Sequence, residues 1–141
     1  MKNSLLETPK SISKVVQKYT KVCIYKKMKK VLTEHIVLAD VYVNLLKIGS
    51  PELPKAKQAF LEQANDIAKV FSSLNPCVLK LKEQKKMWTE HAEYVVEIAT
   101  LINNKKYTEA NIVNDGYTDE MAMMSMTIAD GLADLYCCGD C

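Results

Sequence analysis

The sequence predicts an all-α protein: an up-down-up-down four-helix bundle made of two similar helical hairpins, with an additional basic helix or arm at its N-terminus. Two observations predict this fold class. Apolar residues recur at alternating intervals of three and four along most of the chain, which is typical of helices that face other helices. The breaks between these stretches are short and carry glycine, proline or asparagine, and short connections make neighbouring helices antiparallel.

Length and composition indicate a single globular domain. The chain has 141 residues, of which 48% are hydrophobic and 26% charged, as is ordinary for a soluble protein. No apolar run approaches the roughly 18–20 residues that a membrane span needs, and the first residues lead into no signal-peptide core. We therefore expect no membrane partner and a location in the cytoplasm or within a virus particle.

Net charge is +2, but the charges are unevenly distributed. Residues 1–86 carry 17 Lys and 7 acidic residues, a balance of +10, whereas residues 87–141 carry 2 Lys and 10 acidic residues, a balance of −8. Every basic residue is Lys and none is Arg. The missing Arg indicates an AT-rich genome, such as that of a virus or mobile element. Chemically, Lys offers point-charge attraction without the planar bidentate grip of Arg.

Residues 1–23 are expected to form a Lys-rich helical arm. Thr8 and Pro9 suit the N-cap and first helical position, and residues 9–23 carry their own apolar stripe, so a separate helix or arm should stand partly clear of the bundle. Eight lysines and no acid lie between residues 10 and 30: Lys10, Lys14, Lys18, Lys21, Lys26, Lys27, Lys29 and Lys30. They form either a solvated face or a contact surface for DNA or an acidic protein.

The bundle itself is expected over residues 24–136. Glycine after Ile48, followed by Ser50-Pro51-Glu52, ends one helix and starts the next, and Asn75-Pro76 ends the second. Its four helices are expected at residues 24–48, 51–74, 77–103 and 108–136. The hairpins 24–74 and 77–136 would then be related by an approximate two-fold axis.

The sequence Thr-Glu-His occurs twice, ending at His35 and at His91, and each histidine lies on an apolar stripe. Counting back from the turns places both imidazoles at one level, facing inward, with Asp66 and Asp119 near that level on the returning helices. Two histidines with carboxylates in a bundle core can hold a transition metal or small ligand. The favoured alternative is a structural pair, each ring hydrogen-bonded to a polar side chain of a neighbouring helix.

Five stretches carry a resemblance to a known family: Leu32-Thr33-Glu34-His35-Ile36, Asn65-Asp66-Ile67-Ala68, Phe71-Ser72-Ser73-Leu74-Asn75-Pro76, Met87-Trp88-Thr89-Glu90-His91 and Ala129-Asp130-Gly131-Leu132-Ala133-Asp134. Over residues 32–135 the chain is similar to an uncharacterised family of bacterial proteins built of repeated helical hairpins. The resemblance implies a helical bundle and no particular reaction. The family's extra N-terminal hairpin is missing here, and the Lys-rich segment stands in its place.

The cysteines fall into two groups. Cys23 and Cys77 lie on apolar stripes and are expected to be small buried side chains. The C-terminal tail, residues 137–141, holds three more: Cys137, Cys138 and Cys141. These are either incidental thiols of a frayed end or an inter-chain link, through a disulfide or a shared metal, in a homo-oligomer.

No catalytic motif is present: the four glycines are scattered, and neither a serine elbow nor a Cys-His arrangement occurs. The sequence therefore predicts no enzyme and no cofactor. The first functional hypothesis is a non-enzymatic binding or packaging protein that contacts nucleic acid or an acidic partner through its Lys-rich N-terminal third. The alternatives are a bundle that holds a metal or small ligand between His35 and His91, and a purely structural module that associates with itself.

Overall fold

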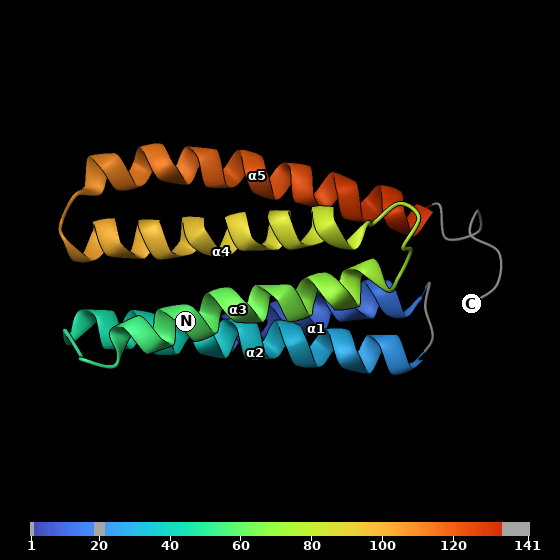
Figure 1. The fold of residues 1–141 in the computed structure, drawn as a ribbon, viewed down its shortest axis with the longest axis horizontal. Helices are drawn as coiled ribbons and strands as arrows, with labels where there is room; N and C mark the ends of the chain where they lie inside the picture. The colour runs from blue at the N-terminus through green and yellow to red at the C-terminus, as the bar shows by residue number, and fades with distance from the viewer. Residues whose placement is uncertain (1, 19–21, 134–141) are drawn as a thin grey trace.

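The computed structural model describes residues 2–18 and 22–133, which form five helices and no strand. The helices are α1 (Lys2–Gln17), α2 (Val22–Lys47), α3 (Leu53–Ser72), α4 (Leu81–Asn103) and α5 (Tyr107–Ala133). Consecutive helices run in opposite directions along a common long axis (Figure 1). The predicted all-α class is confirmed. Among the described helices, none is long and apolar enough to cross a membrane.

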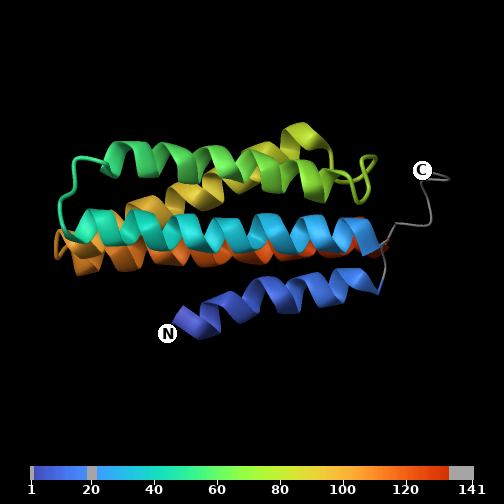
Figure 2. The same ribbon diagram turned by 90° about the horizontal axis from the view of Figure 1, so that it is seen from below.

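The helices pack in the order of the chain. Figure 2 shows α2 between α1 and α3, and Figure 1 shows α4 between α3 and α5. Helix α2 also touches α4, but in the described part of the chain α2 and α5 make no extensive contact. A closed four-helix bundle needs that contact as well, so the predicted arrangement is seen only in part. Helices α1 and α5 are thus outer helices, each packed mainly against one neighbour.

The N-terminal helix differs from the prediction at its start and in its packing. Helix α1 begins at Lys2, so Pro9 lies inside it instead of opening it. Pro9 and Ser13 are buried, and Val16 is 2% exposed, because α1 packs against α2 and does not stand clear of the other helices. This packing offsets the helix hydrogen bond that a proline removes.

The turn between α2 and α3 agrees with the prediction from the sequence, but the connection between α3 and α4 does not. Gly49 has φ +61°, a left-handed conformation that glycine adopts easily. The helix expected from Cys77 begins only at Leu81, because residues 73–80 form a loop that closes one end of the molecule. Cys77 is exposed in this loop, so its predicted burial was wrong. The side chain of Cys23 is outside the described residues.

This loop is attached to α5 by two contacts. The side-chain amide of Asn75 donates to the carbonyl of Gly131 at 3.1 Å. Leu79 is fully buried over the same glycine: a Cβ placed on Gly131 would lie 2.5 Å from the Cγ of Leu79. Because Gly131 has no side chain, the loop can pack directly against α5 at this position.

Replacing Gly131 by alanine should lower the free energy of unfolding by about 1–3 kcal/mol, because either Leu79 or α5 must move. Urea denaturation monitored by far-UV circular dichroism measures this change. Gly116→Ala is the matched control in the same helix, since its Cβ would meet only the end of the flexible Tyr94 side chain, at 3.2 Å. That change should be neutral or stabilise by up to about 1 kcal/mol. Equal effects of the two substitutions would contradict the close approach of Leu79.

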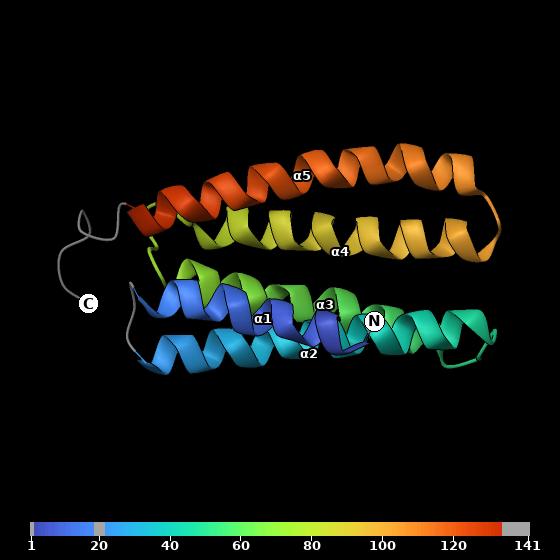
Figure 3. The same cartoon turned by 180° about the vertical axis from the view of Figure 1, so that it is seen from behind.

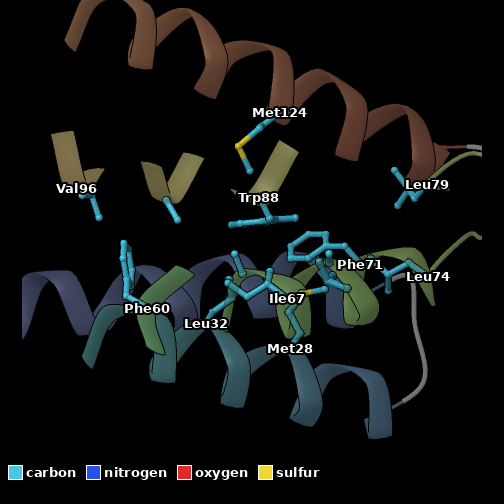
Figure 4. Packing of buried hydrophobic residues seen from close by; sticks show 14 of the residues in the cluster. Met28, Leu32, Phe60, Ile67, Phe71, Leu74, Leu79, Trp88, Val96 and Met124 are labelled. Carbon is cyan, nitrogen blue, oxygen red and sulfur yellow. The ribbon is translucent and has the colours of Figure 1, made fainter. Parts of the chain in front are cut away.

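The core lies between the helices and is richest where α2, α3 and α4 meet. Figure 4 shows Phe71 and Trp88 facing each other across α3 and α4, with ring centroids 5.1 Å apart. Met124 reaches this cluster from α5, and Met28 and Leu32 reach it from α2. The two histidines lie at the edge of the same cluster, since Trp88 also contacts both of their rings.

Candidate functional site

His35 on α2 and His91 on α4 are both buried, and their ring centroids are 5.9 Å apart. The prediction that both imidazoles face inward at one level is confirmed. Each histidine lies three or four positions from apolar residues of its helix, so its ring is on the same side of the helix as they are. The pair forms a polar centre inside an otherwise apolar core.

The hydrogen bonds around His35 determine which of its ring nitrogens donates. Its Nδ1 lies 2.9 Å from Oε1 of Gln63, whose Nε2 donates to the carbonyl of Val31 at 2.7 Å. The Gln63 oxygen is therefore the acceptor, and a neutral His35 donates from Nδ1. Burial lowers the pKa of His35, although the bond to Gln63 acts in the opposite direction. Phe60 stacks on the ring at 4.6 Å.

His91 is paired with a carboxyl group. Its Nδ1 lies 3.3 Å from Oε2 of Glu120, and the ring of Tyr117 packs against it at 5.3 Å. Burial, and then the nearby His35, lower the pKa of His91 to about 4. Burial, and then the charge of Glu90, raise the pKa of Glu120 to about 7. These opposite shifts favour a protonated Glu120 beside a neutral His91.

The carboxylates predicted to accompany the histidines do not do so. Asp66 is exposed and forms an ion pair with Lys69 at 2.8 Å, and Asp119 is also exposed. Each is off the inward stripe, one position away along its helix from a residue on that stripe, which turns its side chain by about 100°. Within residues 2–18 and 22–133, no three His, Cys, Asp or Glu side chains are grouped as metal ligands.

The actual partners, Gln63 and Glu120, carry a signal in the sequence. Gln63 lies on the apolar stripe of its helix between Phe60 and Ile67, and Glu120 follows Tyr117 by three positions and precedes Met124 by four. A polar residue on an inward stripe, opposite an inward histidine, indicates the hydrogen-bond partner. The structural alternative for the histidines thus matches the described geometry.

An acidic groove of about 830 Å³ runs between α4 and α5, beside the His91–Glu120 pair. Its carboxylates come from both helices, and methionine side chains line its apolar part. They are Glu83, Glu90, Glu93 and Glu97 of α4, Asp119 and Glu120 of α5, and Met87, Met123 and Met124. Lys86 is the one basic side chain among the lining residues and is paired with Glu90 at 3.7 Å. The groove therefore favours a cationic occupant with some apolar surface.

Two acceptors next to the groove lack donors in the described part of the chain. Oε1 of Gln84 and Oε1 of Glu120 are buried, and neither has a hydrogen-bond partner among the described residues. Gln84 is only 1% exposed, so its amide oxygen is removed from water without compensation. Buried polar atoms are nearly always satisfied, and an unsatisfied acceptor has a free-energy cost of about 1–3 kcal/mol. Both oxygens are inaccessible to solvent, so they lie beneath the surface of the groove.

A basic surface lies on the opposite side of the helix array. Because α1 and α2 run in opposite directions (Figure 3), the C-terminal half of α1 lies beside the N-terminal half of α2. The basic surface consists of six exposed lysines: Lys14, Lys18, Lys26, Lys27, Lys29 and Lys30. Only Lys30 forms an ion pair, with Glu34 at 3.7 Å; the other five have no carboxylate partner in the described part of the chain.

The predictions for Lys10, Lys21 and the cysteines of the C-terminal tail have different outcomes. Lys10 is exposed but forms an ion pair with Glu7 at 3.2 Å, so its charge is partly compensated. Lys21 lies outside the described residues. The tail thiols also lie outside them, so their two interpretations stay predictions: Cys137, Cys138 and Cys141.

Comparison with known proteins adds no family. No family model, no curated protein and no solved structure matches this chain. The resemblance to bacterial helical-hairpin proteins therefore stays a prediction. The features of the structure that bear on function are the basic surface, the buried histidine pair and the acidic groove.

Proposed function

We propose that this chain is a non-enzymatic binding protein that contacts the phosphate backbone of nucleic acid through its basic surface. The observation that carries the proposal is the group of five lysines without carboxylate partners on two adjacent helices. Four lysines elsewhere in the chain form ion pairs, and others, such as Lys47, have no partner among the described residues. The five lysines differ from these because no acidic residue occurs between residues 10 and 30. A surface of one sign attracts a polyanion.

The chemistry of lysine sets the expected mode of binding. Each ammonium group that replaces counterions at a phosphate releases them, which makes affinity fall steeply with salt. Base-specific recognition needs bidentate side chains at base edges, and the chain has no Arg. Binding should therefore be independent of sequence. Packaging of an AT-rich genome of a virus or mobile element is the biological setting that fits this proposal.

The rest of the fold serves as scaffold in this proposal. Helices α3 and α4 support α2, and α1 packs on α2. The buried titratable groups support a structural role, since His35 and His91 already form hydrogen bonds with Gln63 and Glu120.

Fluorescence anisotropy with a short DNA duplex tests the proposal. We expect binding at low salt that is independent of sequence and is lost at moderate salt. The triple variant Lys26→Ala, Lys27→Ala, Lys29→Ala removes three unpaired lysines and should weaken binding at least tenfold. It should also reduce the slope of log K against log salt by up to about 2.7, at about 0.9 per phosphate contact.

The control is a second triple variant with the same change in charge. Lys47, Lys55 and Lys57 are exposed, have no ion-pair partner among the described residues, and lie near the α2–α3 turn at the other end of the molecule. Their replacement by alanine should leave most of the affinity. Equal losses in the two variants would show that net charge alone matters. Absence of DNA binding at low salt, or binding of polyglutamate in preference to DNA, would overturn the proposal.

A further inference from the structure

The two outer helices of the array have complementary surfaces. Helix α5 packs mainly on α4 and borders the acidic groove, whereas α1 packs mainly on α2 and carries Lys14, with Lys18 directly after its last residue. Apolar side chains are exposed on both: Ile12 and Val15 of α1 are 40% and 55% exposed, and Met123 of α5 is 65% exposed. Each outer helix therefore presents an apolar strip beside charges of one sign.

The groove and α1 also match in length. The groove extends along α4 from Glu83 to Glu97, a distance of about 21 Å at 1.5 Å per residue. Helix α1 has 16 residues, which corresponds to about 24 Å. One helix of this length can therefore fill the groove from end to end.

The charges of the groove specify the chemistry of the occupant. Glu93 and Asp119 are exposed at the sides of the groove and attract cations. A lysine ammonium group supplies a positive charge there and three N–H donors. Its aliphatic stem can lie along the methionine side chains that line the groove. An occupant with lysines beside a small apolar strip fulfils all of these requirements.

From these observations we infer that the acidic groove binds α1 of a second copy of this chain. The outward face of α1, with Ile12, Val15, Lys14 and Lys18, lies in the groove of the next copy while its inward face stays on α2. The interface is heterologous, because a basic edge meets an acidic edge and the two are different surfaces. Such an interface builds rings if its rotation closes and filaments if it does not. The inference goes beyond nucleic-acid binding. It shares Lys14 and Lys18 with the basic surface and otherwise rests on the acidic groove and on the apolar residues Ile12 and Val15.

Sedimentation velocity tests this inference with the complete chain. At low salt the weight-average mass should rise with concentration above the 15.9 kDa of one copy, and high salt should return it towards that value. Two charge reversals should each lower the association constant at least tenfold. The first, Lys14→Glu with Lys18→Glu, places an acidic α1 against an acidic groove. The second, Glu93→Lys with Asp119→Lys, places two lysines at the sides of the groove, against the lysines of the incoming α1.

Mixing the two variants provides the decisive measurement. In the mixture, the basic α1 of the second variant meets the native groove of the first, and the acidic α1 of the first meets the reversed groove of the second. Both interfaces are then matched, so the mass should rise again to that of the unmodified protein. All four substituted residues are exposed, so we expect both variants to fold. Far-UV circular dichroism spectra equal to that of the unmodified protein would verify this.

A protein that stays at the mass of one copy at low salt overturns the inference. Association that survives either charge reversal, or that the mixture fails to restore, overturns it as well. The Lys26→Ala, Lys27→Ala, Lys29→Ala variant keeps the outward face of α1 and the groove intact. It should associate normally even where it fails to bind DNA, so that failure of this inference and failure of the proposed function can be told apart.

Discussion

Replacing Phe60 by alanine should lower the free energy of unfolding by about 3–5 kcal/mol. Phe60 is completely buried on α3 and stacks on the ring of His35 at 4.6 Å and 28°. Alanine would leave a cavity next to a polar ring, so lost apolar contacts and the exposure of His35 to that cavity add together. Domains of this size are stable by about 5–15 kcal/mol, and the variant should lose a large part of that stability.

Urea denaturation followed by Trp88 fluorescence measures this loss, because the indole lies 6.3 Å from the same histidine ring. Phe60→Leu keeps most of the buried volume and should be milder, at about 1–2 kcal/mol. Tyr107→Ala removes an aromatic ring that is 59% exposed and should change stability by less than about 0.5 kcal/mol. A loss below about 1 kcal/mol for Phe60→Ala would contradict its place in the core.

The features that the sequence predicted correctly are local. Spacing by three and four placed His35, His91 and Gln63 on inward stripes, because a residue's side on a helix depends only on its neighbours in the chain. The turn at Gly49 was predictable for the same reason, since its positive φ belongs to one residue. Helix content and direction follow from these signals and from the short connections between them.

The features that the sequence missed depend on contacts between distant residues. Leu79 packs on Gly131, 52 positions away, and this contact draws residues 73–80 into a loop where periodicity suggests helix. Pro9 marks a helix start by its own chemistry, but packing on α2 lets α1 continue on both sides of it. Periodicity also says which side of α5 is apolar without saying which helix covers that side.

The candidate surfaces also combine a feature that the sequence shows with features that depend on helix packing. The imbalance of charge between residues 1–86 and 87–141 is visible in the sequence, but its meaning depends on how helices are placed. Packing of α5 on α4 gathers six carboxylates around one groove and leaves Gln84 Oε1 without a donor among the described residues. Neither feature can be derived from the order of residues along one helix.

Replacing Glu120 by glutamine should make stability depend strongly on pH between 4.5 and 6.5. In this window the unfolded chain carries a proton on His91 and none on Glu120, given ordinary pKa values of 6.5 and 4.5. In the folded chain the pKa of Glu120 is raised to about 7 and that of His91 is lowered to about 4, so the proton is on Glu120 instead. The pair therefore binds one proton in both states and does not make the free energy of unfolding depend on pH in this window.

In the Glu120→Gln variant only the histidine of this pair titrates. The unfolded state then binds one proton more than the folded state, so stability rises with pH and is lost as the pH falls through the window. The added slope should be at most about 1.4 kcal/mol per pH unit, which amounts to about 2 kcal/mol over the two units, in urea denaturation series of the variant and the unmodified protein. Asp119→Asn, the exposed carboxylate one position earlier, is the control and should leave the slope unchanged. Parallel profiles for Glu120→Gln and the unmodified protein would show that the folded pair does not hold its proton on Glu120.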